Sequence, residues 1–415
     1  MRNLRIGLFL GWRQIKRSNI WASTLIISVV TLTVINLIVI SGILNGITDG
    51  VLRDVRNQAL GDIAIKPADD ETRIKNTQRI MRELETYQDI QSFTPRYEES
   101  VTIEANYNER RDLSVDRDII AVNIQGIDPI TENQTLGVST LVNEGEYLTK
   151  DDRGYILIGK HYVDKYAKEY GDVFDSLKNI EPGTVVKVSN GYESREFTVK
   201  GIINSKIDMV SLSVFMPELD FRRMFNRVDY DANKILIKLK PGSDSQAVVN
   251  RLLSNNVAGD AKIELFEEGI PKYIKDVTET FNFLSTAVGT ISIFVATITV
   301  FIIIFINTLS RRQHIGILKA VGINKKALQY AYAFQATFYG LIGVSLSLLI
   351  IFFLLVPYFI KNPIDFPYTD VELSVSTFEL INKCLFLLTM MLISGFIPAW
   401  MIVRKNTLDS ILGRK

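Results

Sequence analysis

Four long stretches without a charged side chain constrain the fold of this chain more than any other feature. These stretches are residues 18–48, 280–310, 327–360 and 384–403. A helix rises about 1.5 Å per residue and the hydrocarbon core of a bilayer is about 30 Å thick, so roughly 20 apolar residues cross it. Each stretch is long enough, and we therefore expect four transmembrane helices.

The first stretch lies where a signal peptide would lie, and the fourth contains residues that weaken a helix. A signal peptide has an apolar region of only about 7–15 residues and a small-residue cleavage site, whereas the first apolar run extends from Ile20 to Leu44 without such a site. The fourth run contains Ser394, Gly395 and Pro398, but a proline near a helix end is tolerated in membranes. We expect a retained anchor and a fourth span.

The distribution of Lys and Arg predicts the orientation, because short segments rich in these residues stay in the cytoplasm. The segments before span one, between spans two and three, and after span four hold 14 Lys and Arg against one acidic residue, Asp409. Residues 47–280 hold 31 Lys and Arg against 41 Asp and Glu, and the loop 357–383 carries four Asp and Glu. We expect a protein of the cytoplasmic (inner) membrane with both termini in the cytoplasm and the large block outside.

Residues that form disulfides or bind metals are scarce. The one cysteine, Cys384, begins span four, so the outer block contains no disulfide. With more than 200 residues, that block is long enough for a core of its own. His161 and His314 lie far apart and without cysteine nearby, which argues against a zinc site. We expect no metal site.

The outer block is expected to be an α+β domain entered and left by helical stalks. Residues 46–60 continue the first span with helical spacing, and residues 270–281 run into the second. Neither segment has the Gly and Ser content of a flexible linker. Between them the pattern predicts helices at 76–87 and 243–255, and strands at 100–107, 119–126, 184–189, 195–203 and 234–240.

Two hairpins and a division into lobes are expected within this block. Asn190-Gly191 between two alternating runs is a strong hairpin signal. The strands at 100–107 and 119–126 predict a second hairpin with a charged tip at residues 108–117, either solvated or docked to a partner. We expect two lobes, divided between about residues 135 and 215.

The chain lacks the sequence signals of an enzyme. It contains no glycine-rich phosphate loop, no G-x-S-x-G and no H-E-x-x-H. Clustered carboxylates such as Asp69-Asp70-Glu71 are expected to be solvated. We predict no catalytic residue and no cofactor bound by this chain, and with no Walker motif it cannot hydrolyse ATP alone.

Both basic cytoplasmic segments have an amphipathic pattern. In residues 1–19, Leu4, Leu8, Trp12 and Ile15 share one helical face, which predicts an elbow helix lying among lipid headgroups. After span two, a helix would place Ile315, Leu318 and Val321 on one side and end at Gly322. Such a helix fits a groove of another protein or an anionic lipid surface, and composition leaves both open.

The same segment carries a family resemblance. Residues 311–347, RRQHIGILKAVGINKKALQYAYAFQATFYGLIGVSLS, resemble the signature R-x-x-E-I-G-I-L-[RK]-A-x-G of the FtsX-like permeases of ABC transporters. Pro398-Ala399-Trp400 followed by Arg404-Lys405 resembles the closing pattern of that family. One span before a large domain and three after it match the type VII architecture of MacB, LolC, LolE and FtsX.

Short motifs in the outer block resemble the lipoprotein-releasing LolC/LolE branch more than the MacB branch. They are VNIQGIDP at 122–129, YILIG at 155–159, and the segments 182–188, 201–203 and 215–217. The chain departs from the family pattern at His314, where an acidic residue is usual, and at Thr407, where a proline is common.

The resemblance implies partners and a site. The segment from Arg311 to Gly322 would be a coupling helix that seats on a cytoplasmic ABC ATPase dimer, which binds ATP and Mg²⁺. Its predicted site residues are Arg311, Arg312, His314, Ile315, Gly316, Leu318, Lys319, Val321 and Gly322. Further partners would be a second permease copy or a paralogue, membrane lipids, and a periplasmic carrier or accessory protein. Nucleic acid is not expected.

The resemblance also implies mechanotransmission, in which ATP hydrolysis in a separate subunit moves the periplasmic domain so that lipoproteins or other amphiphiles leave the outer leaflet. The alternatives are FtsX-like signalling to a cell-wall hydrolase, MacB-like efflux of peptides or drugs, and an ATPase-independent receptor. Spans one and two offer few polar groups to line a hydrophilic path. Asn36 and Asn45 are candidates for substrate contact or for pairing with a neighbouring helix.

Close helix packing is expected at Ala336/Gly340 and Gly343/Ser347, where small residues are spaced by four.

The predicted organisation is an elbow helix (1–19), transmembrane helix 1 (20–46), the extracytoplasmic α+β domain with stalks inserted between helices 1 and 2 (47–280), transmembrane helix 2 (281–308), the coupling helix and loop (309–327), transmembrane helix 3 (328–357), an extracytoplasmic loop (358–380), transmembrane helix 4 (381–403) and a cytoplasmic tail (404–415).

Overall fold

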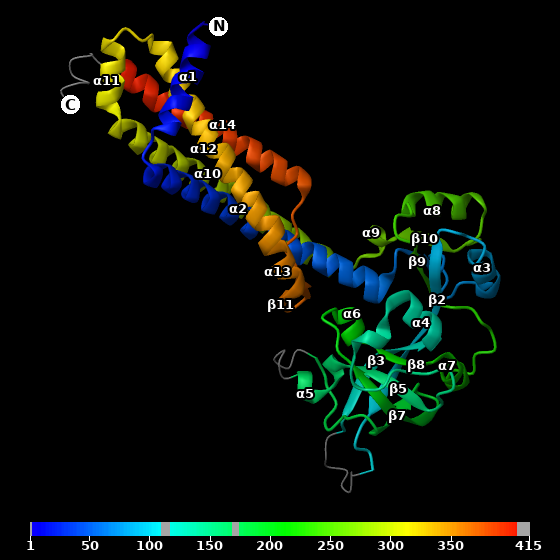
Figure 1. Ribbon diagram of the computed structural model, residues 1–415. Coiled ribbons are helices and arrows are strands. Elements are labelled where there is room, and N and C mark those ends of the chain that lie inside the picture. Colours follow the sequence, from blue (N-terminus) through cyan, green and yellow to red (C-terminus); the bar gives the residue numbers. More distant parts are fainter. Residues whose placement is uncertain (1, 109–116, 168–173, 405–415) are drawn as a thin grey trace. The chain divides into compact units, whose positions relative to one another are not determined.

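A computed structural model describes residues 2–108, 117–167 and 174–404 (Figure 1). The chain divides into two compact units. The helical unit takes its residues from 1–50, 276–366 and 370–415, and the sheet unit from 51–275 and 367–369.

Helices make up most of the helical unit. They are α1 (Arg2–Lys16), α2 (Ile20–Val55), α10 (Lys272–Ser310), α11 (Arg312–Ala320), α12 (Lys325–Ile350), α13 (Val356–Lys361) and α14 (Thr377–Arg404). Single π-helical segments continue α2 over Arg56–Leu60 and join α12 to α13 over Ile351–Leu355. A small hairpin of β11 (Ile364–Phe366) and β12 (Thr369–Val371) precedes α14.

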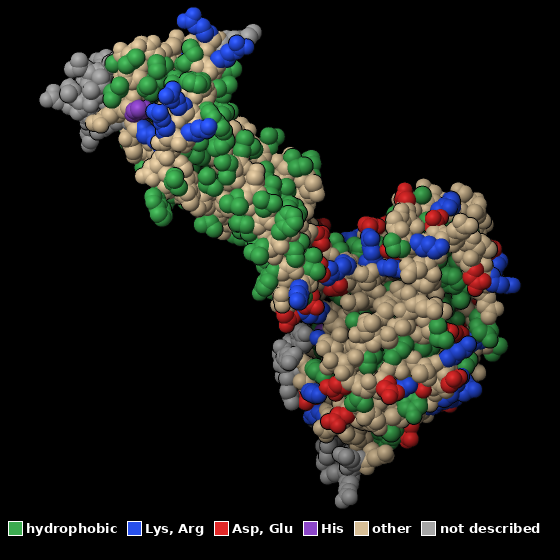
Figure 2. Space-filling model, in the orientation of Figure 1, with side chains coloured by type: hydrophobic (Ala, Val, Ile, Leu, Met, Phe, Trp, Pro, Cys, Tyr) green, Lys and Arg blue, Asp and Glu red, His purple; other side chains and the backbone are tan. Residues whose placement is uncertain are grey.

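Within the described residues, four helices are long and apolar enough to cross a membrane: Ile20–Leu60, Lys272–Ser310, Lys325–Lys361 and Thr377–Met401. The four helices expected from the charge pattern are therefore present. The first two have 41 and 39 residues, about twice the roughly 20 needed to cross. Figure 2 shows hydrophobic side chains over much of the visible surface of this unit, with Lys and Arg gathered at one end of it.

Small residues let the helices of this unit approach closely, as their spacing predicted. A Cβ added at Gly343 of α12 would lie 2.6 Å from Cγ1 of Val30 on α2, and one added at Gly340 would overlap the sulfur of Met391 on α14. A Cβ added at Gly395 of α14 would lie 2.6 Å from Cβ of Ala336. Helix α12 thus packs against both α2 and α14.

Helix α1 packs against α12 through two glycines and through Trp12, whose ring lies 5.6 Å from that of Phe338 in a T-shaped arrangement. A Cβ at Gly7 would lie 2.7 Å from Cβ of Tyr330, and one at Gly11 would lie 2.9 Å from the carbonyl oxygen of Ala331. The side chains of Leu4, Leu8 and Trp12 remain 47%, 38% and 46% exposed. The amphipathic face predicted from the sequence is therefore only partly exposed, because Trp12 contacts Phe338 and Ile15 packs against the core of the helical unit.

The sheet unit alternates strands with short helices. Its strands are β1 (Ile63–Lys66), β2 (Ile90–Glu104), β3 (Ile119–Ile127), β4 (Val142–Gly145), β5 (Tyr155–Gly159), β6 (Val185–Ser189), β7 (Ser194–Ile203), β8 (Val214–Pro217), β9 (Lys234–Leu239) and β10 (Lys262–Leu265). Its α-helices are α3 (Thr77–Leu84), α4 (Pro129–Leu136), α5 (Asp164–Ala167), α6 (Asp208–Ser211), α7 (Glu218–Met224), α8 (Ser245–Ser254) and α9 (Phe266–Gly269), and its 3₁₀ turns are Val138–Leu141 and Lys160–Tyr162.

All these strands join one mixed sheet in the described part of the chain. Its order is β10-β1-β9-β2-β3-β8-β5-β7-β4, and β6 pairs with β2 and β7. The first half of the 15-residue strand β2 pairs with β9 and the second half with β3. Because one strand serves both neighbours, the sheet continues past the point where β2 changes partner.

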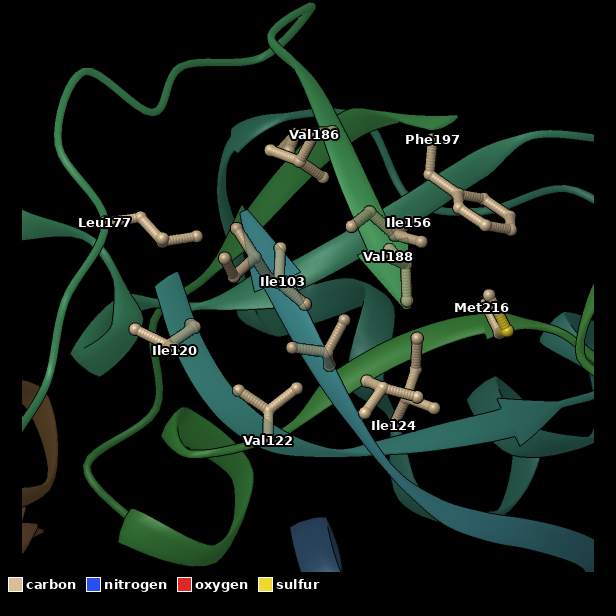
Figure 3. Close-up of a cluster of buried hydrophobic side chains, with 14 of the residues drawn as sticks. Ile103, Ile120, Val122, Ile124, Ile156, Leu177, Val186, Val188, Phe197 and Met216 are labelled. Atoms are coloured by element: carbon tan, nitrogen blue, oxygen red, sulfur yellow. The ribbon is translucent and has the colours of Figure 1, made fainter. Parts of the chain in front are cut away.

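Two hydrophobic cores cover the sheet. One draws on residues 63–90 and 235–258, and the other on residues 97–232, including Ile103, Ile124 and Met216 (Figure 3). The expected division between about residues 135 and 215 is therefore wrong. The part of the chain that forms the second core is larger than predicted, because β2 and β3 contribute to this core together with the segments that follow them.

Turn and cap residues explain several element boundaries. The β6–β7 hairpin predicted at Asn190-Gly191 is confirmed, with Gly191 at φ 89° and the Asn190 side-chain oxygen accepting hydrogen bonds from the backbone of Tyr192 and Glu193 at 3.0 and 2.7 Å. Helix α4 begins at its cap Asp128, which accepts hydrogen bonds from the N–H groups of Ile130 and Thr131.

The β2–β3 hairpin is also confirmed, with Glu104 opposite Ile119. Of its predicted tip, residues 109–116 lie outside the described residues. Strand β2 begins at Ile90, ten residues before the predicted start. The intervening segment contains Pro95 and several charged residues, a composition that hides a strand whose pairing comes from the distant β9.

Candidate functional site

The segment between α10 and α12 forms a separate short helix with defined ends. Helix α11 begins after Arg311 and ends at Ala320. Gly322, at φ 93°, adopts the left-handed conformation that reverses the chain. Asn324 then caps α12 by accepting a hydrogen bond from the N–H of Lys326 at 2.9 Å. The predicted helix and its glycine end are thus both present.

One face of α11 is packed inside the helical unit. The side chain of Ile315 is 1% exposed and belongs to a cluster with Leu328 and Tyr332 of α12 and Ala399 of α14. Leu318 packs against the same cluster. Ile315 and Leu318 therefore hold α11 to the rest of the helical unit, which corrects the expectation that they form the surface offered to a partner.

The opposite face of α11 is exposed. Residues Gln313, His314, Ile317 and Ala320 lie on it, and Val321 continues it past the helix end. Ile317 and Val321 are large apolar side chains, 51% and 78% exposed. We call Gln313, His314, Ile317, Ala320 and Val321 the outer face of α11.

Sequence reasoning missed Ile317. The spacing of Ile315, Leu318 and Val321 suggested one apolar face, but at 100° per residue His314, Ile317 and Val321 also form a face, on the other side of the helix. The helical spacing of His314, Ile317 and Val321 could therefore have identified Ile317 from the sequence. Only the position of α12 and α14 distinguishes the buried face from the free one.

The remaining predicted site residues differ in their surroundings. The Nη2 atom of Arg311 donates a hydrogen bond of 2.8 Å to the hydroxyl of Ser18. Gly316 is buried, Lys319 is half-buried and Gly322 is exposed. Arg312 begins α11. Since residues 311–322 include three basic residues and no acidic one, the segment offers positive charge around an exposed apolar face.

The two candidate asparagines of span one have opposite environments. Asn36 is exposed, and the described part of the chain contains no hydrogen-bond partner for its side chain. The side-chain oxygen of Asn45 accepts a hydrogen bond from Ser285 of α10 at 2.6 Å, and its nitrogen donates one to Glu379 of α14 at 3.4 Å. Asn45 thus joins three helices of the helical unit.

No metal site accompanies these residues: in the described ranges, no group of three or more His, Cys, Asp and Glu is arranged to hold a metal ion.

Comparisons with known proteins assign the chain to a family. The model of the MacB-like periplasmic core domain matches residues 23–254, more than half of the chain. The chain belongs to the MacB-like periplasmic core domain family. The model of the FtsX-like permease C-terminal region matches residues 286–407, which include α11, α12 and α14. The expected resemblance to FtsX-like and MacB-type proteins is confirmed at this level.

Individual relatives are distant. Two uncharacterised ABC transporter permeases of Methanocaldococcus jannaschii are 22% identical over 66% of this chain and 23% identical over 38% of it. These matches span 65% and 44% of the relatives' own lengths, less than two thirds of either. The periplasmic region of MacB from Actinobacillus actinomycetemcomitans is 18% identical and is matched over 97% of its length and 55% of this chain, with a TM-score of 0.36.

With the family model and the four apolar helices together, the chain is a membrane protein with a large extracytoplasmic domain.

Proposed function

We propose that this chain is the membrane subunit of an ABC transporter in which a separate ATPase hydrolyses ATP and docks on the outer face of α11. The observation that carries the proposal is the two-sided environment of α11. Ile315 anchors the helix internally, at 1% exposure, while Ile317 and Val321 are 51% and 78% exposed on the other side. An apolar face on a firmly anchored helix suits a groove-type docking partner.

The charge pattern supports placing this surface in the cytoplasm. The segment that contains α11 and the segments at the two chain ends hold 14 Lys and Arg and one acidic residue, as is typical of cytoplasmic segments. With that orientation, the sheet unit is periplasmic or extracellular and α11 is accessible to a cytoplasmic ATPase.

Mechanotransmission is the mode of action that the helices support. Helix α2 is unbroken for 36 residues and α10 for 39, so each continues beyond the roughly 20 residues that a bilayer requires. A helix that extends past the membrane carries a displacement from one side to the other. Polar side chains suited to a hydrophilic path are few, and Asn45 pairs with Ser285 and Glu379.

The proposed substrate is a lipoprotein or another amphiphile taken from the outer leaflet. Helix α10 exposes large apolar side chains along its length, among them Phe283, Ile291, Phe294, Ile298 and Ile302. Such a surface accommodates acyl chains, and a second permease, identical or paralogous, would enclose them. The resemblance of the outer-block motifs to LolC/LolE favours this substrate class.

The docking surface is tested by co-purification of the full-length chain with the ABC ATPase encoded nearest to it in the genome. We expect Ile317→Glu and Val321→Glu to abolish co-purification, because each places a charge in an apolar interface. Leu253→Glu on α8, which is 56% exposed, is the matched control and should leave the complex intact. Retention of the ATPase by both α11 variants would exclude this surface.

The substrate class is tested in proteoliposomes that contain the permease, the ATPase and a fluorescently labelled triacylated lipopeptide. The expected result is ATP-dependent release of the lipopeptide to a soluble acceptor. Absence of release from a complex that hydrolyses ATP would exclude lipopeptides as the substrate class, whereas absence of any complex would reject the ATPase-coupled function.

A further inference from the structure

A cluster of hydrogen-bonded polar side chains lies where α2, α11 and α12 meet. The hydroxyl of Ser18 lies 2.9 Å from that of Ser23, which in turn lies 2.9 Å from the hydroxyl of Tyr339. Gln335 donates to Tyr339 at 3.1 Å, and Arg311 donates to Ser18 at 2.8 Å. We call Ser18, Ser23, Arg311, Gln335 and Tyr339 the polar hub.

The hub is set into an apolar surrounding. Gln335 and Tyr339 on α12 are 2% and 3% exposed. A buried polar group without a partner costs about 1–3 kcal/mol, so these side chains favour arrangements in which the hub stays connected. The hub therefore constrains the start of α2 and the start of α11 against the middle of α12.

The position of the hub along the chain gives it a specific connection. Arg311 is the residue that precedes α11, and Ser18 lies two residues before α2. Helix α11 is joined directly by the chain to α10 and α12, whereas more than 200 residues separate it from α2. A movement of α11 reaches α10 and α12 through the backbone, but it reaches α2 through non-covalent contacts.

The side chains of the hub have alternative hydrogen-bond partners within reach. The hydroxyl of Ser18 has Arg311 at 2.8 Å, Ser23 at 2.9 Å and Tyr339 at 3.5 Å, and a hydroxyl both donates and accepts. In the described part of the chain, the side-chain oxygen of Gln335 is buried without a hydrogen-bond partner. This acceptor is available to a second hydrogen-bonded arrangement of the hub, and two arrangements are what a coupling element requires.

We propose that the polar hub transmits displacement of α11 to α2, with Ser18 and Tyr339 as the positioning residues that couple Arg311 to the start of that helix. The inference rests on the proposed function, because it takes docking of an ATPase on α11 as the source of the displacement. It goes further because it names the side chains that connect α11 to α2. Through these side chains α2 responds to the nucleotide state of the partner.

The test compares amide hydrogen exchange of the full-length chain in complex with its ATPase, with and without a non-hydrolysable ATP analogue. In the wild type we expect nucleotide-dependent changes in the peptides of α11 and in those covering both ends of α2. In Ser18→Ala and Tyr339→Phe the change in α11 should persist, while that in α2 should be lost. Because both variants act on one network, the double variant should lose no more than either alone.

Matched variants separate coupling from folding. Tyr330→Phe removes a hydroxyl from the same helix outside the hub and should behave as wild type. Ser18→Thr keeps a hydroxyl and should restore the change in α2. Val30 also packs α2 against Gly343 of α12, and none of these variants changes that contact. If substitution at position 18 merely weakened the packing of α2, Ser18→Thr would lose the change in α2 as Ser18→Ala does.

The outcomes distinguish the inference from the function on which it rests. If the wild-type complex shows no nucleotide-dependent change in α11, the proposed function is rejected and the inference with it. If α11 responds and the change in α2 persists in both Ser18→Ala and Tyr339→Phe, the inference alone is overturned. Loss in both variants with recovery in Ser18→Thr supports it.

Discussion

The hydroxyl of Ser285 on α10 donates a hydrogen bond of 2.6 Å to the side-chain oxygen of Asn45 on α2. The same amide donates to Glu379 of α14, so one side chain of span one connects three helices. Asn36, nine residues earlier on the same helix, is exposed. The sequence made both asparagines candidates for substrate contact or helix pairing, but in the fold only Asn45 is paired with neighbouring helices.

Replacing these asparagines should separate their roles. Hydrogen bonds between membrane helices stabilise by about 0.6–2 kcal/mol, so we expect Asn45→Ala to lower the free energy of unfolding by about 1 kcal/mol. Asn36→Ala should have little effect on the isolated chain. Unfolding in mixed micelles of increasing SDS content measures both, and equal destabilisation by the two variants would contradict the assignment.

The glycine at position 46 of α2 should not tolerate a side chain. A Cβ there would overlap the carbonyl oxygen of Glu372, in the segment before α14. Backbone must move to relieve this overlap, so we expect Gly46→Ala to destabilise the protein by about 1–3 kcal/mol. Gly289→Ala on α10 is the control, since its Cβ would lie 3.4 Å from the hydroxyl oxygen of Ser41. Thermal unfolding in detergent should show a lower midpoint for Gly46→Ala alone.

The two faces of α11 should respond differently to truncation. Ile315→Ala removes a side chain that is 1% exposed, and such core truncations cost about 2–5 kcal/mol. Ile317→Ala removes an exposed side chain and should change stability by less than about 0.5 kcal/mol. Thermal unfolding of the chain without its ATPase provides the comparison. A larger loss for Ile317→Ala would reverse the assignment of the faces.

A buried ion pair should stabilise the sheet unit only while both partners are present. The Nε atom of Arg96 on β2 donates to Glu132 of α4 at 3.0 Å, and Thr94 donates to the same carboxylate at 3.0 Å. Removing one partner of a buried pair leaves a charge without compensation and costs about 3–5 kcal/mol. We expect Glu132→Leu to be strongly destabilising and Arg96→Met with Glu132→Leu to be milder, as measured by hydrogen exchange of β2.

The stability of the sheet unit should depend on pH through His161. Burial of its ring, together with the neighbouring charge of Lys160, lowers its pKa from 6.5 to about 4. Between these values the unfolded chain holds a proton that the folded chain does not, so stability falls as pH falls through this window, by at most about 1.4 kcal/mol per pH unit. Below about pH 4 this contribution levels off.

The neighbouring Asp208 contributes with the opposite sign. Its carboxylate oxygen lies 3.7 Å from Nδ1 of His161, and burial raises its pKa from 3.8, so its contribution to stability falls as pH rises above 3.8. His161→Gln should remove the loss of stability between about pH 6.5 and 4, whereas Asp208→Asn should make that loss steeper, because it removes the opposing contribution. Thermal unfolding across this pH range measures the two slopes, and an unchanged slope in His161→Gln would contradict the assignment.

Local patterns in the sequence were sufficient for the elements. The charge-free stretches identified four apolar helices, Asn190-Gly191 identified a hairpin, and Gly322 identified the end of α11. Each of these features depends on residues close together in the chain: a run of apolar side chains, a turn that requires positive φ, or a helix period of 3.6. The start of β2 at Ile90 escaped prediction because its pairing with β9 comes from residues more than 140 positions away.

What the sequence by itself determined is therefore the set of helices, most of the strands and the segment in which the candidate site lies. Only the tertiary structure decided which side of α11 is free, that Asn45 is paired while Asn36 is exposed, and that Ser18 lies within reach of Arg311. The physical reason is the same in each case. A helical pattern defines faces, but whether a face is buried depends on which distant residues cover it, and for Ile315 these are Leu328, Tyr332 and Ala399.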